Sequence, residues 1–159
     1  MSRNEASGVL QAEVWRKSYN AIGIRMENDR MIFSDLLQAE KLCKVQSRNS
    51  SWVADYPDGD NFMQLFYGPN VNQNNAGCLA DPDVDKLYGA ARMTPAGPER
   101  DALYHKMARR IEVIGAARMG YARYRNMLAQ PSVLGYTKHP ILHQEWQYID
   151  IDPSRMAPK

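Results

Sequence analysis

The sequence has no apolar run that approaches the roughly 20 residues needed to cross a lipid bilayer. It also has no long run of basic residues, and its formal net charge of +2 is close to neutral. Residues 1–7 lack the apolar centre of a secretory signal peptide. We therefore expect no membrane-spanning segment within the chain and no nucleic acid as its partner.

Cysteine is scarce, because Cys43 and Cys78 are the two that occur in 159 residues. Two cysteines define no disulfide framework, and their spacing in the sequence gives no geometry for a bond between them. Two interpretations therefore stay open. The pair forms a disulfide in an oxidising compartment, or the two residues are small buried apolar side chains.

The sequence also lacks the groups of residues that carry catalysis or bind metals. His139 and His143 have a spacing that suits two metal ligands on a helix, but Pro140 lies between them and no cysteine or carboxylate cluster accompanies them. No Ser-His-Asp or Cys-His arrangement and no phosphate-binding loop can be assigned. We therefore expect a protein that is not an enzyme and that needs neither a metal nor another cofactor.

Hydrophobic residues make up 44% of the chain, which is enough for one sizeable core. Apolar residues at helical spacing predict helices over residues 8–22, 31–40, 61–67, 82–91 and 98–114. Alternating or short apolar runs predict strands over residues 24–27, 42–46, 52–54 and 119–129. On the second helix, Ile32, Leu36 and Leu37 are expected to face inward. The α-β-α-β order of the N-terminal part favours a layered α/β fold.

The stretch most informative about function is residues 52–62, with the sequence WVADYPDGDNF. It predicts the end of a buried strand, then Asp55, a Tyr-Pro corner and an Asp-Gly-Asp turn whose last residue, Asp60, caps a helix. A side chain at the exit of a strand is held by the sheet yet faces an opening, so Asp55 is well placed to contact a ligand. The alternative is that Asp55 caps only the local turn.

The same stretch resembles the W-x-A-D-Y-P-D-x-D-N-F segment of the family 5 (dipeptide, oligopeptide and nickel type) extracellular solute-binding proteins of ABC importers. Other motifs of that family have counterparts in Asn74-Asn75, in the E-R-x-x-L-Y helix start at residues 99–104 and in the V-x-G-Y element at residues 133–136. Residues 145–150 match its closing W-x-Y-x-D segment, so the resemblance implies a terminal strand there. Ser51 departs from the glycine that usually precedes the tryptophan. The resemblance covers residues 8–152 and corresponds to roughly the last third of a family member.

The resemblance implies a fold and a division of the chain. It implies an α/β fold in which residues 1–120 form part of the second lobe of a periplasmic-binding-protein-like (class C, type II) structure. Residues 121–159 would form the hinge crossing and a C-terminal segment that belongs to the first lobe. Because such proteins are exported, the resemblance also implies a periplasmic location for the full-length protein and a chain that begins inside it.

The resemblance further implies which residues contact the ligand. In the peptide-binding relatives, the aspartate at the position of Asp55 pairs with the α-amino group of the ligand through a charge-assisted hydrogen bond. The preceding strand, here with Val53 and Ala54, offers its backbone to the peptide. Trp52 is expected to pack in the core beneath the site, and the alternative is that it forms a wall of the pocket.

Arg123 and Tyr124 lie where peptide-binding relatives carry pocket-facing aromatic residues. An arginine at this place could bind a ligand carboxylate through two parallel hydrogen bonds. Neighbouring residues of a strand face opposite ways, so one of the two would point inward. A surface salt bridge is the alternative for Arg123.

The function that the resemblance implies is the non-catalytic capture of peptides or related small solutes and their delivery to a membrane permease. Family members bind peptides, nickel complexes, sugars and opines through one architecture, so the sequence does not name the ligand. The alternative is a free-standing structural or interaction domain, or a degenerate gene remnant without transport activity; a hydrolase is a weaker third. Apolar residues beyond residue 124 would lack their first-lobe partner and favour a homodimer of this chain.

Overall fold

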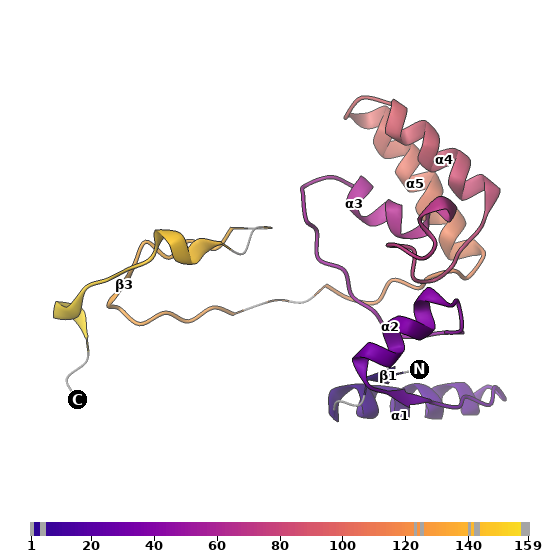
Figure 1. Ribbon diagram of the computed structural model, residues 1–159, viewed down its shortest axis with the longest axis horizontal. Coiled ribbons are helices and arrows are strands. Elements are labelled where there is room, and N and C mark those ends of the chain that lie inside the picture. Colours follow the sequence, from indigo (N-terminus) through magenta and orange to yellow (C-terminus); the bar gives the residue numbers. More distant parts are fainter. Residues whose placement is uncertain are drawn as a thin grey trace.

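The computed structural model describes residues 2–3, 6–122, 124, 126–139, 141 and 144–156. Within these ranges the chain combines helices with short strands, in agreement with the predicted mixed α/β class (Figure 1). The α-helices end at residue 113, and the described part of the C-terminal segment contains 3₁₀ turns and one strand pair. No helix in the described ranges is long and apolar enough to cross a membrane.

The N-terminal part contains two helices and one pair of two-residue strands. Helices α1 (Ala6–Ala21) and α2 (Phe33–Lys41) lie where the apolar spacing predicts helices. The strands β1 (Ser2–Arg3) and β2 (Arg30–Met31) pair in parallel. Two residues per strand give few ladder hydrogen bonds, so this pair contributes little stability by itself.

The buried faces of these two helices are smaller than the sequence predicts. Leu36 on α2 is buried, whereas Ile32 and Leu37 are exposed. On α1 the apolar row that includes Leu10 and Val14 is also exposed. Helix α1 therefore presents an uncovered apolar face.

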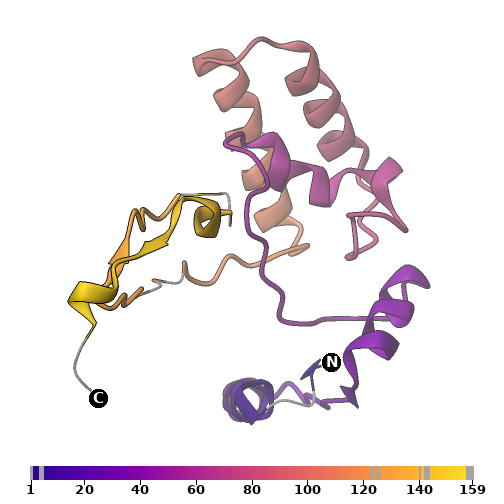
Figure 2. The same ribbon diagram turned by 60° about the vertical axis from the view of Figure 1, so that its left-hand side comes forward.

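Helices α4 (Pro82–Met93) and α5 (Pro98–Val113) form an antiparallel hairpin that contains the core (Figures 1 and 2). Each begins with proline, whose missing N–H costs no hydrogen bond in the first turn of a helix. The core cluster consists of buried residues from both helices: Val84, Tyr88, Met107 and Ile111. The apolar spacing that predicts a helix over residues 98–114 places Met107 and Ile111 four residues apart on one face, and the structure buries both.

A short helical segment packs against this hairpin. Helix α3 (Asp60–Met63) continues into the 3₁₀ turn η1 (Gln64–Phe66), and apolar side chains of both pack on the core. Gly59 lies so close to α5 that a Cβ atom added to it would be 2.9 Å from Cδ2 of Tyr104. The absence of a side chain at Gly59 thus lets residues 52–62 approach the hairpin.

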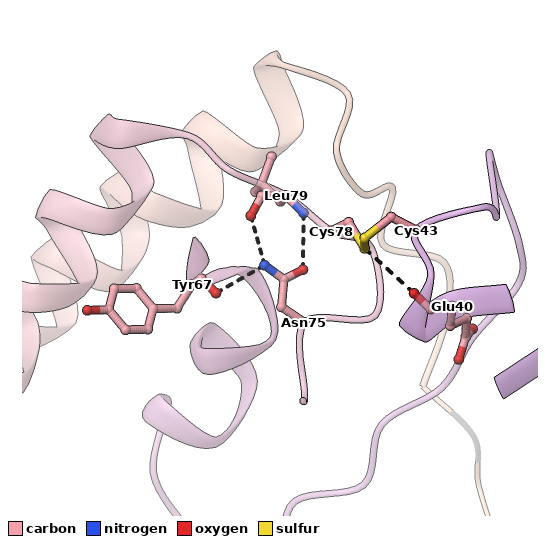
Figure 3. Close-up of a disulfide and its surroundings, with 6 residues drawn as sticks. All are labelled: Glu40, Cys43, Tyr67, Asn75, Cys78 and Leu79. Carbon is pink, nitrogen blue, oxygen red and sulfur yellow. Dashed lines mark hydrogen bonds between the residues drawn. A yellow bond between two sulfur atoms is a disulfide. The ribbon is translucent and has the colours of Figure 1, made fainter. Parts of the chain in front are cut away.

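The asparagine-rich loop before α4 folds around the completely buried side chain of Asn75. After the 3₁₀ turn η2 (Gly68–Asn70), Nδ2 of Asn75 donates to the carbonyl oxygens of Tyr67 and Leu79, at 3.0 and 2.8 Å (Figure 3). Its Oδ1 accepts from the backbone N–H of Leu79 at 3.2 Å. The side chain therefore satisfies backbone groups of its own loop, as expected for asparagine in such loops.

A disulfide joins the N-terminal part of the chain to this loop. Cys43, which follows α2, is bonded to Cys78, with Cα atoms 5.8 Å apart and a separation of 35 positions in the sequence (Figure 3). The Sγ atom of Cys78 lies 3.6 Å from the carbonyl oxygen of Glu40, which is a contact and not a hydrogen bond because a disulfide sulfur carries no proton. The interpretation of two unbonded apolar side chains is therefore wrong.

The C-terminal segment lies apart from the helices in both views (Figures 1 and 2). Its described elements are β3 (Val133–Leu134), the 3₁₀ turn η3 (Glu145–Tyr148), β4 (Asp150–Ile151) and the 3₁₀ turn η4 (Pro153–Arg155). Strands β3 and β4 pair antiparallel. The assignment of residues 1–120 and 121–159 to two different lobes stays a prediction.

Several predicted strands are wrong. Residues 24–27, 42–46 and 52–54 form no strand, and neither do the described residues of 119–129. Residues 145–150 form η3 and the first residue of β4 instead of one continuous strand. An apolar pattern becomes a strand only where a neighbouring strand satisfies its backbone N–H and C=O groups. The described part of this chain supplies no such neighbour for these segments, so the predicted layered order does not form there.

Candidate ligand-binding site

Asn61, the second residue of α3, ties together the residues of the 52–62 stretch. Its side chain is completely buried, and its Oδ1 accepts hydrogen bonds from Nε1 of Trp52 at 2.8 Å and from the backbone N–H of Asp55 at 3.1 Å. Its Nδ2 donates to Oδ2 of Asp55 at 3.2 Å. One amide group therefore holds both the indole and the carboxylate that the sequence singles out.

The orientation of the Asn61 amide follows from the chemistry of its neighbours. Both groups beside Oδ1 are N–H donors, so an oxygen must face them. The NH₂ group then faces the carboxylate of Asp55, which accepts hydrogen bonds when ionised. Because the buried amide is satisfied in this orientation, it is a fixed anchor for the turn.

The other two aspartates of this stretch are engaged with helices α4 and α5. Asp58 forms an ion pair with Arg100 of α5, and its Oδ1 accepts from the backbone N–H of Asp60 at 2.9 Å. Asp60 accepts from two hydroxyl groups, that of Tyr56 at 2.6 Å and that of Tyr88 at 2.7 Å. Both carboxylates therefore serve to hold the turn against the helical hairpin.

Asp55 is in a different environment from these two aspartates. Its side chain is exposed, and the Asn61 amide is its one hydrogen-bonding side-chain partner among the described residues. That partner is neutral, whereas Asp58 has a guanidinium group beside it. Asp55 is therefore the aspartate of this stretch whose negative charge is open to a cationic group of a ligand.

The tyrosines around Asp60 are held in their protonated form. The hydrogen bond to the Asp60 carboxylate raises the pKa of Tyr56, and burial adds to that effect. Burial raises the pKa of Tyr88, and the same carboxylate raises it further. Burial likewise raises the pKa of Tyr104. At neutral pH, Tyr56 and Tyr88 therefore remain hydrogen-bond donors to Asp60.

The prediction that Asp60 caps the helix is wrong. Helix α3 begins at Asp60, and its N-cap residue is Gly59, which has no side chain to accept a hydrogen bond. Asp58 accepts the backbone N–H of Asp60 instead. The carboxylate of Asp60 is thereby left to the tyrosine hydroxyl groups, one of which, Tyr88, comes from α4 and could not be placed from local sequence.

An open hollow of about 290 Å³ lies where this turn meets the helical hairpin. Its lining consists of charged and aromatic side chains: Tyr56, Asp58, Asp60, Arg92, Arg100 and Tyr104. Arg100 is paired with Asp58, and the guanidinium carbon of Arg92 lies 5.8 Å from the ring centre of Tyr88. Two carboxylates balance two guanidinium groups, so the hollow offers no net charge that would attract an ion.

Of the residues predicted to contact a ligand, the structure brings Trp52 and Asp55 together through Asn61. Trp52 is 40% exposed, so the expectation that it packs in the core is wrong. Val53 is exposed and Ala54 is half-buried, and neither belongs to a strand. The prediction required a sheet to hold the backbone of these residues, and the structure has no sheet there.

The remaining two predicted residues lie in the C-terminal segment. Tyr124 is 98% exposed, so it packs against no part of this site. Arg123 lies outside the described residues, and its proposed contact with a ligand carboxylate stays a prediction. In the part of the chain that the structure describes, no group of three or more His, Cys, Asp or Glu side chains could hold a metal ion.

Sequence reasoning missed Asn61 as a site residue. In the sequence it is one residue of the 52–62 motif and the first residue of a predicted helix, and nothing local marks it as buried. A polar side chain at such a position is buried only when it finds hydrogen-bond partners. The partners of Asn61, Trp52 and Asp55, lie nine and six residues earlier, and that distance hides the relationship from helical or strand periodicity.

The chain matches no model of a known protein family, and comparison with curated proteins finds no match either. The resemblance to family 5 solute-binding proteins therefore depends on the motif residues themselves, above all on residues 52–62.

Proposed function

We propose that this chain is the C-terminal part of the ligand-binding component of an ABC importer, which captures peptides or related small solutes and delivers them to a membrane permease. It carries out no catalysis. Asp55 recognises the amino group of the ligand. The observation that carries the proposal is the exposed carboxylate of Asp55, which is oriented by a neutral buried amide and has no cationic partner among the described residues.

The chemistry of this carboxylate supports an ammonium group as its partner. A hydrogen bond between an ammonium and a carboxylate is charge-assisted and stronger than one between neutral groups. A carboxylate that already pairs with arginine, like that of Asp58, would have to break that pair to bind a ligand. Asp55 has no such pair to break within the described residues, and one of its carboxylate oxygens makes no hydrogen bond there.

The uncovered apolar surface supports the second part of the proposal, in which another lobe covers this chain in the working protein. Exposed apolar side chains occur on α1 and along the C-terminal segment: Leu10, Val14, Tyr124, Leu128, Trp146 and Tyr148. Contact with another polypeptide is one of the roles of exposed apolar surface, and it is the one that this proposal assigns. In a protein that closes on its ligand like a hinge, residues 1–120 would belong to one lobe and residues 121–159 would return to the other.

A periplasmic location fits the same proposal. Disulfides such as Cys43–Cys78 form and persist in oxidising compartments, of which the periplasm is one. The second candidate function, a structural or interaction domain, is favoured by the exposed apolar side chains alone. That candidate assigns no ligand to Asp55, so the two functions differ in one measurable property, which is the binding of an amine.

The proposal is tested by titrating the chain with the dipeptide Ala-Ala and following the amide and indole resonances by NMR. One lobe supplies about half of the contacts, and half of a micromolar binding energy of about 8 kcal/mol corresponds to millimolar affinity. We expect shifts centred on Asp55 and Trp52 at millimolar dipeptide. N-acetyl-Ala-Ala, which has no ammonium group, should produce none of them.

Asp55→Asn keeps the shape of the side chain and removes its charge, so it should weaken Ala-Ala binding by roughly 1.5–3 kcal/mol. The matched control is Asp29→Asn, which changes an exposed carboxylate in a loop and should leave binding unchanged. Equal shifts for Ala-Ala and its acetylated form would contradict the proposal. Affinity in the micromolar range for this chain by itself would contradict the two-lobe arrangement.

A further inference from the structure

The relationship between Asn61 and Asp55 has two contact points and not one. The backbone N–H of Asp55 donates to Oδ1 of Asn61 at 3.1 Å, and Oδ2 of Asp55 accepts from Nδ2 of Asn61 at 3.2 Å. The main chain and the side chain of Asp55 are therefore held by opposite ends of the same amide. This arrangement fixes the direction of the carboxylate relative to its own backbone.

We infer that Asn61 is a positioning residue for recognition of the ligand's ammonium group. It fixes the direction of the Asp55 carboxylate and, being neutral, does not compensate its negative charge. The inference rests on the proposed function. Asn61 is completely buried and cannot touch the ligand itself, so it acts through Asp55. Its own orientation is secured by the indole N–H of Trp52, which donates to Oδ1 at 2.8 Å.

The neutrality of Asn61 is the chemical reason why this residue suits the task. A cationic side chain in its place would orient the carboxylate equally well, but it would also compete with the ligand for the negative charge. The neighbouring pair of Asp58 and Arg100 shows what such a partner does, because that carboxylate is committed to its guanidinium group. An amide orients the carboxylate through a hydrogen bond and leaves the charge in place.

The other titratable groups around this turn are already engaged with one another. Asp58 pairs with Arg100 of α5, and Asp60 accepts from Tyr56 of the turn and from Tyr88 of α4. Two further titratable side chains line the same hollow, Arg92 of α4 and Tyr104 of α5. A change of charge at position 61 is therefore felt first by Asp55, its direct hydrogen-bond partner.

The substitution Asn61→Asp separates the positioning role from a merely structural one. It keeps the size of the side chain and the two accepting hydrogen bonds, from Trp52 and from the backbone of Asp55. It replaces the donating Nδ2 by a carboxylate oxygen at a place 3.2 Å from Oδ2 of Asp55. Two carboxylates this close repel each other when both are ionised, so the pair keeps one shared proton up to a higher pH than a single carboxyl group does.

An ammonium ligand favours the doubly ionised pair, so its binding to Asn61→Asp releases the shared proton. The affinity of the variant for Ala-Ala should therefore rise with pH, by up to about tenfold per pH unit where one proton is released per ligand. Wild-type affinity should stay constant between about pH 5 and 7, below the α-amino pKa of about 7.7–8.0. A flat profile in the variant as well would overturn the inference.

A ligand-free measurement distinguishes failure of this inference from failure of the proposed function. The ¹³Cγ resonance of Asp55, followed against pH, should show an additional titration step in Asn61→Asp that the wild type lacks. Identical titration curves in the two proteins would overturn the inference. An additional step, accompanied by no Ala-Ala binding in the wild type, would uphold the control of Asp55 by Asn61 and overturn the amine ligand.

The indole resonance of Trp52, assigned with Trp52→Phe, reports whether Asn61→Asp keeps the local fold. If that resonance shows that the variant is unfolded, Asp55→Glu decides the question, because the changed residue is exposed and the substitution should leave the fold intact. The longer side chain keeps the charge but cannot keep both contact points with Asn61. We expect at least a tenfold loss of Ala-Ala affinity, and unchanged affinity would overturn the inference.

Discussion

Arg110, near the end of α5, binds the residue that caps the start of α4. Its Nη2 donates to Oδ2 of Asp81 at 2.8 Å, and its Nε donates to Oδ1 at 3.3 Å. Oδ1 of Asp81 also accepts the backbone N–H groups of Asp83 and Val84, at 3.1 and 2.9 Å. One carboxylate thus caps α4 and connects it to α5, which fixes the hairpin on which the 52–62 turn rests.

This relationship predicts a pH-dependent contribution to stability. The hydrogen bond from Arg110 and those from the helix N–H groups hold the pKa of Asp81 below its ordinary value. A group whose pKa is lower in the folded state stabilises the fold above its unfolded pKa, about 3.9 for aspartate. That stabilisation is lost as the pH falls through the lower, folded pKa.

We therefore expect Asp81→Asn to lower the urea midpoint near pH 7 and the difference from wild type to shrink near pH 3. Asparagine is itself a good N-cap residue, so the loss reports mainly the ion pair with Arg110. Urea unfolding at several pH values measures it, with Asp29→Asn as the control. A difference of the same size at both pH values would contradict the assignment.

The contact between Gly59 and Tyr104 predicts a steric effect on stability. The backbone at Gly59 is helical (φ −59°), so alanine is acceptable there conformationally, but its Cβ would lie 2.9 and 3.1 Å from the buried ring of Tyr104. We expect Gly59→Ala to destabilise the protein by about 1–3 kcal/mol, as overpacking of a core does. Chemical denaturation measures the difference in unfolding free energy.

Gly89 offers a matched control for this substitution. It lies inside α4, and a Cβ atom added there meets no atom within 4 Å. Gly89→Ala should therefore stabilise the protein by about 0.5–1 kcal/mol, since alanine is the better helix former. If both substitutions shifted stability in the same direction, the close packing of the 52–62 turn against Tyr104 would be wrong.

The disulfide between Cys43 and Cys78 predicts a dependence on redox conditions. Closing a loop of 35 residues restricts the unfolded chain, and the chain-entropy relation gives a stabilisation of about 3–4 kcal/mol. The double substitution Cys43→Ser/Cys78→Ser should lower the unfolding free energy by that amount, and a reducing agent should do the same to the wild type. Two thiols that react in denaturant without a reducing agent would refute the bond.

The exposed C-terminal segment predicts association of the chain with itself. Leu128 and Trp146 are among its exposed apolar side chains, and at about 25 cal/mol per Å² the covering of several such groups is worth several kcal/mol. We expect a homodimer at micromolar concentration by light scattering and a monomer after truncation at Met119. A monomer in both cases, with the segment resistant to protease, would show that it packs on its own chain.

The helices could be predicted from the sequence because their signals are local. In α4 and α5, proline at the first position and apolar residues at i, i+4 spacing all fall within one helix, and the structure places Met107 and Ile111 in the core as that spacing predicts. The strands predicted at residues 24–27 and 42–46 are wrong, because a strand needs more than a local signal. Their formation depends on a partner strand elsewhere, which local alternation does not reveal.

The candidate site was predicted in part. The sequence predicts Asp55 as a ligand contact and Trp52 as a core residue beneath it. The structure holds both residues through one amide but leaves Trp52 40% exposed. The sequence did not reveal which of the three aspartates of the stretch has a cationic or hydrogen-bonding partner on another helix. That ranking depends on Arg100 and Tyr88, which lie on separate helices.

The sequence by itself determined where α1, α2, α4 and α5 form and which groups are available to bind a ligand. Tertiary structure decided that Cys43 and Cys78 are bonded, that Asn61 is buried, and that Asp58 pairs with Arg100 while Asp55 has no cationic partner among the described residues. The reason is physical. Propensity and capping act within a few residues of chain, whereas disulfides, buried hydrogen bonds and ion pairs depend on which distant groups the packed core brings within about 3 Å of each other.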